Sequence, residues 1–317
     1  TNATSSSHKP AKGQIFLQSS GISSRTIESA SSLPEGQPRS RFSLAGRSSI
    51  LDARVDAARR DLADIRLATR VFAPHYALSV PRTAGRSTPV LAQAGVLESV
   101  RSEVLAGEPF DALEFSGNHI WGVSPVDGSV GFVDADVFTA FWAPTHIVAV
   151  RNAKVRALPS LDSNSVGELA MGSCVAALRS GESAFEVDGG YIDADALLPL
   201  DDLSLDIAAA AERLVGAPAR PGGRSGAGLD TAGLVFLSLQ LAGIEAPRFL
   251  DLQSTEMGMN LAETAPFVRG QILFFQNDAA VVVDAQNAVN VDATGVGRAP
   301  IAALIAAHGP IVRRRQP

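Results

Sequence analysis

Hydrophobic positions recur at two different spacings along the chain, and each spacing predicts a different element. In residues 49–70 the apolar positions follow a roughly helical period among Asp and Arg, which predicts one amphipathic helix. These positions are Ile50, Val55, Ala58, Leu62, Ile65 and Leu67. From residue 71 to residue 203, short runs alternate apolar and polar residues between turn residues, which is typical of β-strands.

The region of alternating spacing contains an internal repeat. Residues 127–136 read DGSVGFVDAD, and residues 188–195 read DGGYIDAD. Each copy ends a series of short strands, so we expect two small all-β barrels, over residues 71–140 and 141–203. The aromatic residues near the repeats, among them Trp121 and Tyr191, are predicted either to pack the barrels or to line a ligand groove.

Helical spacing returns after residue 204. Ser204 is expected to cap a helix over Leu205–Val215, which Gly216 ends in the left-handed conformation. Residues 216–240 then read GAPARPGGRSGAGLDTAGLVFLSLQ, a glycine-rich loop that leads into an apolar helix. Asp230 is the expected cap of this helix, and residue 231 lies in its first turn. A helix N-terminus stabilises a thiolate, so an enzyme of this shape would carry its nucleophile there.

Residues 1–48 differ from the rest of the chain in composition and charge. They are rich in Ser, Gly, Pro and basic residues, so they bury too little apolar surface to offset their ordering entropy. They hold six Lys and Arg against Glu28 and Glu35, whereas the whole chain has a net charge of -6. We expect a disordered basic tail that either stays solvated or inserts into an assembly with an acidic protein partner.

Composition narrows the class of protein. With 46% hydrophobic and 19% charged residues the chain has the composition of an ordinary globular protein. No apolar run approaches the roughly 20 residues that span a bilayer, and residues 1–30 lack the pattern of a signal peptide. Both the cytoplasm and the cell envelope fit these features. The negative net charge argues against nucleic acid as a partner.

Cysteine and histidine are too sparse for several common chemistries. Cys174 is the one cysteine, so no intrachain disulfide can form. Its apolar, strand-like context predicts a buried structural residue. The five histidines are scattered without the spacing of metal ligands. We therefore expect no cofactor and no resident metal.

Several short motifs within residues 205–308 follow one another in the order typical of a known family. They are Gly216-x-Pro218, Gly222-Gly223-Arg224-Ser225, Gly228-Leu229-Asp230, Gly233-Leu234-Val235 and Arg269-Gly270-Gln271-Ile272-Leu273-Phe274-Phe275. With these motifs the chain resembles the NlpC-type cysteine peptidases, papain-like enzymes that cut the peptide part of peptidoglycan. The two preceding repeats resemble the bacterial Src-homology-three-like barrels of the alphaproteobacterial branch. The resemblance implies a multidomain α+β protein with a papain-like domain over residues 204–317.

The residues that would carry out the family's reaction are replaced in this chain. Thr231 stands at the position of the catalytic cysteine, and Ala232 follows it where the family usually has Ser. Asp278 stands at the position of the catalytic histidine. Asp292 stands at the position of the polar residue that orients this histidine. The resemblance therefore implies a degenerate active site.

The expected substrate cleft is changed as well. Ala219 replaces an aromatic Tyr of the family pattern, and Pro221 replaces a Trp. The candidate binding residues, taken from this cleft and from the barrels, are Ala219, Pro221, Asp230, Ala232, Trp121 and Tyr191.

These features predict a catalytically inactive peptidase homologue that serves as a binding or structural component of a larger assembly. One alternative is a hydrolase of altered mechanism that uses Thr231 with Asp278 and Asp292, although a carboxyl group of reference pKa about 4 is a poor base for a neutral hydroxyl. A second is a module that binds cell-wall peptides, which the loss of the cleft aromatics disfavours. The two carboxylates could instead hold Ca²⁺ or Mg²⁺ together with the threonine.

Overall fold

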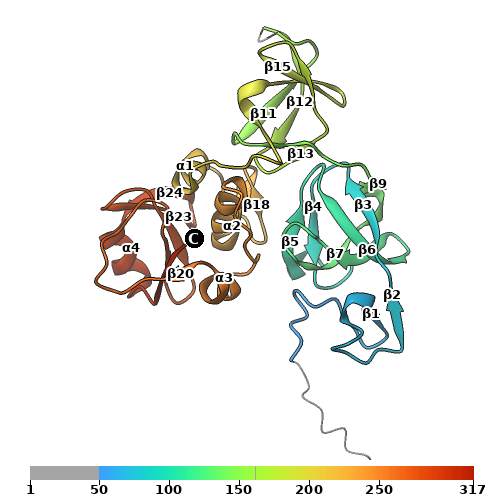
Figure 1. Cartoon of the computed structure of the whole chain (residues 1–317), viewed down its shortest axis with the longest axis horizontal. Coiled ribbons are helices and arrows are strands. Elements are labelled where there is room, and N and C mark those ends of the chain that lie inside the picture. Colours follow the sequence, from blue (N-terminus) through green and yellow to red (C-terminus); the bar gives the residue numbers. More distant parts are fainter. Residues whose placement is uncertain (1–49, 161) are drawn as a thin grey trace, which may run out of the picture. The chain divides into compact units, whose positions relative to one another are not determined.

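The computed structural model of the chain describes residues 50–160 and 162–317. The tail expected over residues 1–48 lies outside these ranges. The described part is an α+β protein in which most elements are β-strands and all four α-helices follow residue 206 (Figure 1).

The prediction of an amphipathic helix over residues 49–70 is wrong. The described part of this segment holds the short strand β1 (Leu62–Asp64), which pairs in parallel with β2 (His75–Ala77). A single 3-10 turn, Ile65–Leu67, follows β1. Among residues 50–70 no α-helix is present.

Aspartate side chains explain why this segment leaves the helical path. The Asp52 carboxylate accepts the backbone N–H of Arg54 at 2.9 Å, and the Asp64 carboxylate accepts that of Arg66 at 2.8 Å. Such local side-chain bonds offer the backbone an alternative to helical hydrogen bonds. Helical spacing of apolar residues alone therefore did not fix a helix here.

A seven-stranded antiparallel sheet follows, in the order β5-β4-β8-β7-β6-β3-β9. Its strands are β3 (Val80–Ala84), β4 (Thr88–Leu91), β5 (Val100–Val104), β6 (Pro109–Ser116), β7 (His119–Val123), β8 (Val130–Asp134) and β9 (Phe138–Ala140). Val90, Phe110, Ile120 and Val133 form the centre of its core. The strand order leaves β5 and β9 as edges, so the described strands form no closed ring, and the Src-homology-three-like assignment stays a prediction.

Two smaller antiparallel sheets make up the second β region, in the orders β13-β10-β17 and β12-β11-β16-β15-β14. Their strands are β10 (His146–Val148), β11 (Asn152–Arg156), β12 (Ser165–Ala170), β13 (Cys174–Val175), β14 (Leu178–Ser180), β15 (Ala184–Val187), β16 (Gly190–Asp193) and β17 (Leu197–Pro199). Val148, Val175 and Ile192 are buried together between them.

The C-terminal region combines all the helices with a six-stranded sheet in the order β20-β25-β21-β22-β23-β24 and the small β18-β19 hairpin. The strands are β18 (Arg224–Ser225), β19 (Gly228–Leu229), β20 (Met259–Asn260), β21 (Ile272–Phe274), β22 (Ala279–Val282), β23 (Asn287–Asp292), β24 (Gly295–Pro300) and β25 (Arg313–Gln316). The helices are α1 (Ile207–Arg213), α2 (Thr231–Leu241), α3 (Leu250–Glu256) and α4 (Ile301–His308). Helices α1 and α2 pack on each other and on β22 and β23 (Figure 1).

Helix α1 lies where the sequence predicted a helix, but its cap differs. The N-cap is Asp206, whose carboxylate accepts the N–H of Ala209 at 2.8 Å, and the predicted cap Ser204 lies outside the helix. Gly216 follows the helix with a φ of 84°, as its expected left-handed role requires. An aspartate is as good a cap as a serine, so two candidates this close in sequence cannot be ranked by residue type alone.

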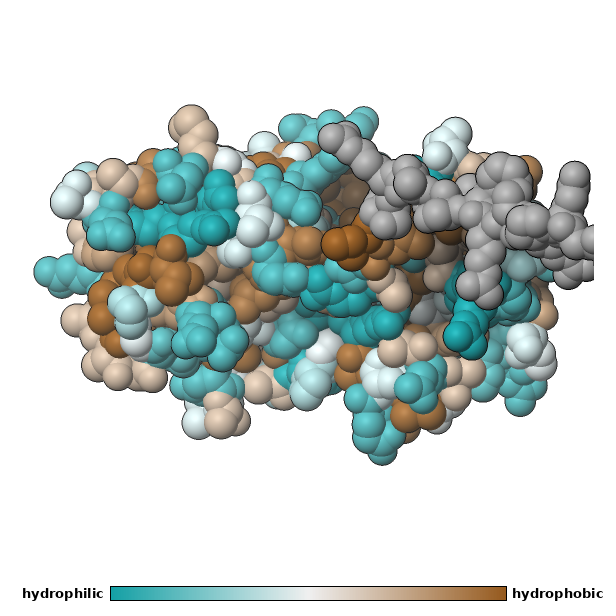
Figure 2. Space-filling view, turned by 90° about the horizontal axis from the view of Figure 1, so that it is seen from below, coloured by the Kyte–Doolittle hydropathy of each residue, from teal (hydrophilic) through white to brown (hydrophobic). Residues whose placement is uncertain are grey.

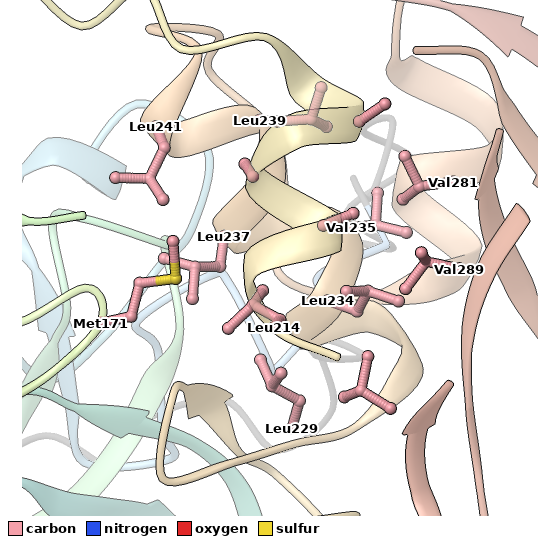
Figure 3. Close-up of a cluster of buried hydrophobic side chains, with 14 of the residues drawn as sticks. Met171, Leu214, Leu229, Leu234, Val235, Leu237, Leu239, Leu241, Val281 and Val289 are labelled. Carbon is pink, nitrogen blue, oxygen red and sulfur yellow. The ribbon is translucent and has the colours of Figure 1, made fainter. Parts of the chain in front are cut away.

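Helix α2 is buried on nearly all sides. Figure 3 shows Leu234 and Val235 directed toward Val281 and Val289 of the sheet, whereas Leu237 lies toward Met171. Because Met171 precedes β13, the helix joins the core of the C-terminal region to that of the second β region. Full burial of each such side chain stabilises the fold by about 1.5–3 kcal/mol. The position of the N-terminus of α2 is therefore set by packing along the whole helix.

The surface carries hydrophobic residues in separate groups among hydrophilic ones, as the face in Figure 2 shows. The most exposed large apolar side chains of the described residues include Phe72, Leu78 and Leu178. None of the helices in the described ranges is both long and apolar enough to cross a membrane.

Candidate functional site

The glycine-rich loop packs tightly against the first turn of α2. A Cβ atom added at Gly233 would lie 2.1 Å from the carbonyl oxygen of Gly223, so only glycine fits this approach. Asp230 caps the helix as predicted, since its Oδ1 accepts the N–H of Gly233 at 2.7 Å. Its Oδ2 accepts the N–H of Gly222 at 3.0 Å and a bond from Arg248 at 2.8 Å. Both oxygens of Asp230 are thus engaged in holding the loop.

The same loop is anchored to the seven-stranded sheet by a buried cluster of charges. The side chains of Arg224, Glu108 and Asp127 are 0% exposed. Nη1 of Arg224 donates to Glu108 at 2.9 Å, its Nε lies 3.0 Å from Asp127, and its backbone N–H donates to Glu103 at 2.7 Å. The cluster fixes where the loop enters α2.

Two carboxyl groups compete for the one buried guanidinium of Arg224, and their pKa values move in opposite directions. Burial raises the pKa of Glu108 by more than Arg224 lowers it. For Asp127 burial also acts to raise the pKa, but Arg224 and the hydrogen bonds from Ser102 and Ser129 outweigh it, so the pKa is lowered. When two carboxyl groups share one counterion, the pKa of one rises and the pKa of the other falls.

The structure brings Thr231 and Asp278 together. Oγ1 of Thr231, in the first turn of α2, donates to Oδ1 of Asp278 at 2.7 Å. Asp278 directly precedes β22, and its Oδ1 also accepts the backbone N–H of Ala279 at 2.8 Å. A hydroxyl and a carboxylate thus occupy the two positions at which the sequence comparison expects a nucleophile and its base.

A histidine that the sequence analysis did not single out completes this network. Nδ1 of His308 lies 3.1 Å from Oδ2 of Asp278, and its ring packs on Phe275 with the centroids 5.5 Å apart. His308 is the last residue of α4, and three strands, β22, β23 and β24, separate it from Asp278 in the chain, so no local spacing pointed to it. Asp278 therefore lies between a hydroxyl and an imidazole, with 16% of its side chain exposed.

Asp292 makes its hydrogen bonds elsewhere. Its Oδ1 accepts the backbone N–H of Thr294 at 2.7 Å and the hydroxyl of the same residue at 2.6 Å. These bonds lower the pKa of Asp292, with smaller contributions from the N–H of Gly295 and from His308. The carboxylate stabilises the turn between β23 and β24, and it makes no bond to Thr231 or to Asp278.

The other candidate binding residues do not share one surface. Ala219 and Pro221 are exposed on the loop, and Ala232 is buried. Trp121 is 4% exposed, and its ring is covered by the guanidinium of Arg59 at 4.4 Å, so it is a packing residue. Tyr191 lines a separate hollow of about 560 Å³ in the second β region.

The described residues offer neither a reactive thiol nor a metal centre. Cys174 is buried, as predicted, and burial raises the pKa of its thiol far above the ordinary value. Within the described ranges no group of three or more His, Cys, Asp or Glu side chains is placed to hold a metal ion.

Comparison with solved structures identifies the fold that carries this network. The chain is similar to a NlpC/P60 family protein from Bacillus cereus ATCC 10987, with a TM-score of 0.64 and 14% identity over 74% of this chain and 99% of that one. Another similar structure is a NlpC/P60 endopeptidase from Photobacterium damselae subsp. piscicida, at a TM-score of 0.46 and 11% identity over 70% of this chain and 64% of that one.

NlpC2 from Trichomonas vaginalis is also similar, at a TM-score of 0.36 and 14% identity over 76% of this chain and 98% of that one. No protein-family model matches the chain, and no curated protein matches it. The Bacillus cereus structure shows that this chain has the NlpC/P60 fold. The resemblance inferred from the sequence motifs is thereby confirmed at the level of the fold.

Proposed function

We propose that this protein is a catalytically inactive NlpC-type peptidase homologue that acts as a binding or structural component of a larger assembly. The hydrogen bond between Thr231 and Asp278 supports this proposal, because it joins a hydroxyl to a carboxylate at the two positions where the sequence resemblance implies a thiol and an imidazole. A carboxylate is a much weaker base than an imidazole. If the proton left to solvent instead, the alkoxide on Thr231 would stand 2.7 Å from the charged carboxylate, which opposes its formation.

Among the described residues, neither His308 nor Cys174 is placed to take over the role of base or nucleophile. His308 contacts the far oxygen of Asp278, so its imidazole is placed to hold the carboxylate and not to take the threonine proton directly. The one cysteine of the chain, Cys174, is buried in the shared core.

The test is incubation of the full-length protein with peptidoglycan stem peptides, followed by chromatography of the products. We expect no cleavage by the protein or by its Thr231→Val variant. Thr255→Val, on the exposed side of α3, is a matched control because its hydroxyl also bonds a neighbour. Cleavage by the wild type and the control that disappears in Thr231→Val would overturn the proposal.

One observation favours a second candidate, a hydrolase of altered mechanism. The chain Thr231–Asp278–His308 is continuous, and in such an enzyme Asp278 would accept the hydroxyl proton while His308 holds the carboxylate. This candidate requires that Asp278→Asn and His308→Gln each abolish cleavage. Asp292→Asn would leave cleavage unchanged, because its bonds stay within its own turn.

A further inference from the structure

A large groove runs along the C-terminal half of α2, apart from the Thr231 network. It has a volume of about 990 Å³, at the upper end of the roughly 300–1,000 Å³ of ligand sites. Phe236 of α2 and Met257 after α3 contribute apolar surface and are themselves almost fully buried. Leu203, Ile244 and Leu252 add partly exposed apolar side chains. The groove can therefore cover apolar groups of a ligand.

The charges around this groove are all of one sign. Six acidic residues contribute to its lining, and no Lys or Arg of the described residues does: Asp52, Asp56, Asp127, whose carboxylate is itself buried, Asp201, Glu245 and Glu256. Arginines pair with three of the six, as Asp52–Arg54, Asp56–Arg70 and Asp127–Arg224; Arg224 is buried, whereas Arg54 and Arg70 are partly exposed. The other three, Asp201, Glu245 and Glu256, are exposed and have no ion-pair partner within the described ranges.

One residue of this lining carries an unsatisfied acceptor. Oε1 of Gln240 is buried and has no hydrogen-bond partner, and Gln240 is one of the lining residues. A buried acceptor without a partner carries a desolvation penalty that a donor from a ligand would remove.

We propose that this groove binds a basic, partly apolar peptide segment of a partner protein. Apolar side chains of the segment pack on the floor, Lys or Arg side chains meet the three unpaired carboxylates, and an N–H donates to Gln240. An acidic peptide or a nucleic acid would be repelled by the same charges. The inference rests on the proposed binding role and adds to it the place and the chemistry of the partner.

Binding of a labelled peptide to the full-length protein tests this inference by fluorescence anisotropy. The probe is a synthetic helical peptide of Leu and Lys with Leu at every third or fourth position, and the same peptide with Glu in place of Lys is the negative control. The triple variant Asp201→Asn, Glu245→Gln, Glu256→Gln is expected to raise the Kd for the Lys peptide about tenfold or more.

A second triple variant distinguishes the effect of the groove carboxylates from the effect of the protein's net charge. Glu168→Gln, Glu182→Gln, Asp195→Asn removes the same charge from exposed carboxylates outside the groove and is expected to keep the wild-type Kd. Equal loss of affinity in both triple variants, or equal binding of the Lys and Glu peptides, would overturn the inference.

A second measurement needs no variant. A photo-reactive form of the Lys peptide, cross-linked to the wild-type protein and mapped by mass spectrometry, is expected to label residues 243–257. Labels confined to other regions contradict the groove. The stem-peptide cleavage assay tests the proposed function independently of the peptide-binding assay. If the Lys peptide does not bind and no stem peptide is cleaved, only the proposal that the groove binds a basic peptide is refuted. If stem peptides are cleaved in a way that depends on Thr231, the proposal of a catalytically inactive protein is refuted.

Discussion

At the scale of single residues, the network around Thr231 combines a capped helix N-terminus with a hydroxyl, a carboxylate and an imidazole. The hydroxyl lies in the first turn of a capped helix, and the side chain of Asp278, just before β22, accepts its hydrogen bond. A hydroxyl and a carboxylate therefore meet at the two positions where the resemblance implies a thiol and an imidazole.

This geometry predicts that a reactive thiol can be rebuilt. In the variant Thr231→Cys with Asp278→His, the helix N-terminus and the imidazole both act to lower the thiol pKa below its ordinary value of about 8.5. In Thr231→Cys alone the thiol faces the Asp278 carboxylate, which opposes ionisation. Alkylation by iodoacetamide as a function of pH measures the difference, with buried Cys174 as a silent background. Identical pH profiles of alkylation for the two variants would contradict the predicted difference in thiol pKa.

The sequence indicated part of this network and could not indicate the rest. Asp230 and Thr231 belong to one continuous motif, so their roles as cap and first-turn residue follow from local spacing. His308 reaches Asp278 from another helix, and that contact depends on how α4 packs. Asp292 lies at the aligned position, but a neighbouring threonine satisfies its carboxylate.

At the scale of elements, close backbone approach fixes the loop against α2. Gly233→Ala improves intrinsic helix propensity by about 1 kcal/mol, but the new methyl group would meet the backbone oxygen of Gly223, so we expect a net loss of stability of about 2 kcal/mol. Gly297→Ala is the control, because no atom lies within 4 Å of its added Cβ and its stability is expected to change by less than about 0.5 kcal/mol. Urea unfolding measures both, and equal effects would contradict the close approach.

The contact of the first described segment with α3 predicts a pH dependence. Arg54 donates to Asp251 at 2.9 and 2.6 Å and also to Asp52. These bonds lower the pKa of both carboxyl groups. A lowered carboxyl pKa stabilises the fold above the unfolded pKa of about 3.9, and this stability disappears as the pH falls through the folded pKa.

Arg54→Gln should therefore reduce stability at pH 7, and this effect should fade progressively as the pH falls below about 4. The reduction is small because Asp251 is 61% exposed. Arg60→Gln removes an exposed arginine from the same segment as a control. Urea unfolding of both variants at pH 7 and well below pH 4 measures the loss of stability. A loss caused by Arg54→Gln that is equally large in acid would contradict the predicted pH dependence.

The spacing of apolar residues correctly predicted helices and strands where tertiary packing agreed with the local preference of the sequence. The alternating runs became strands, and the apolar run after Asp230 became α2. The helical spacing of residues 50–70 failed because aspartates bond nearby backbone N–H groups. Pairing of β1 with β2 depends on residues beyond that segment, which a local pattern does not contain.

At the scale of the whole described chain, the buried charges around Arg224 tie the C-terminal region to the seven-stranded sheet. Arg224→Met would leave Glu108 and Asp127 buried without their counterion, so we expect a loss of about 3–5 kcal/mol. Arg298→Met breaks an ion pair of a half-exposed arginine and should cost less than about 1 kcal/mol. Similar losses in urea unfolding would show that the buried cluster does not stabilise the fold.

The shared core predicts a single unfolding transition. Both tryptophans of the chain, Trp121 and Trp142, lie in or next to the seven-stranded sheet, so their fluorescence follows that region. Cys174 belongs to the core that α2 shares with the second β region, so its labelling in denaturant follows that core. The two midpoints should coincide. A clear separation between them would reveal independent units.

The partners of Arg224 lie in another region of the sequence, and this limits which parts of the chain can be exchanged in a chimaera. Its guanidinium belongs to the C-terminal region, whereas the carboxylates that neutralise it come from the sheet that precedes it in sequence. A chimaera that joins residues 204–317 to an unrelated β region would bury a cation without its counterions. A chimaera that keeps this contact must therefore transfer Glu108, Asp127 and Arg224 together.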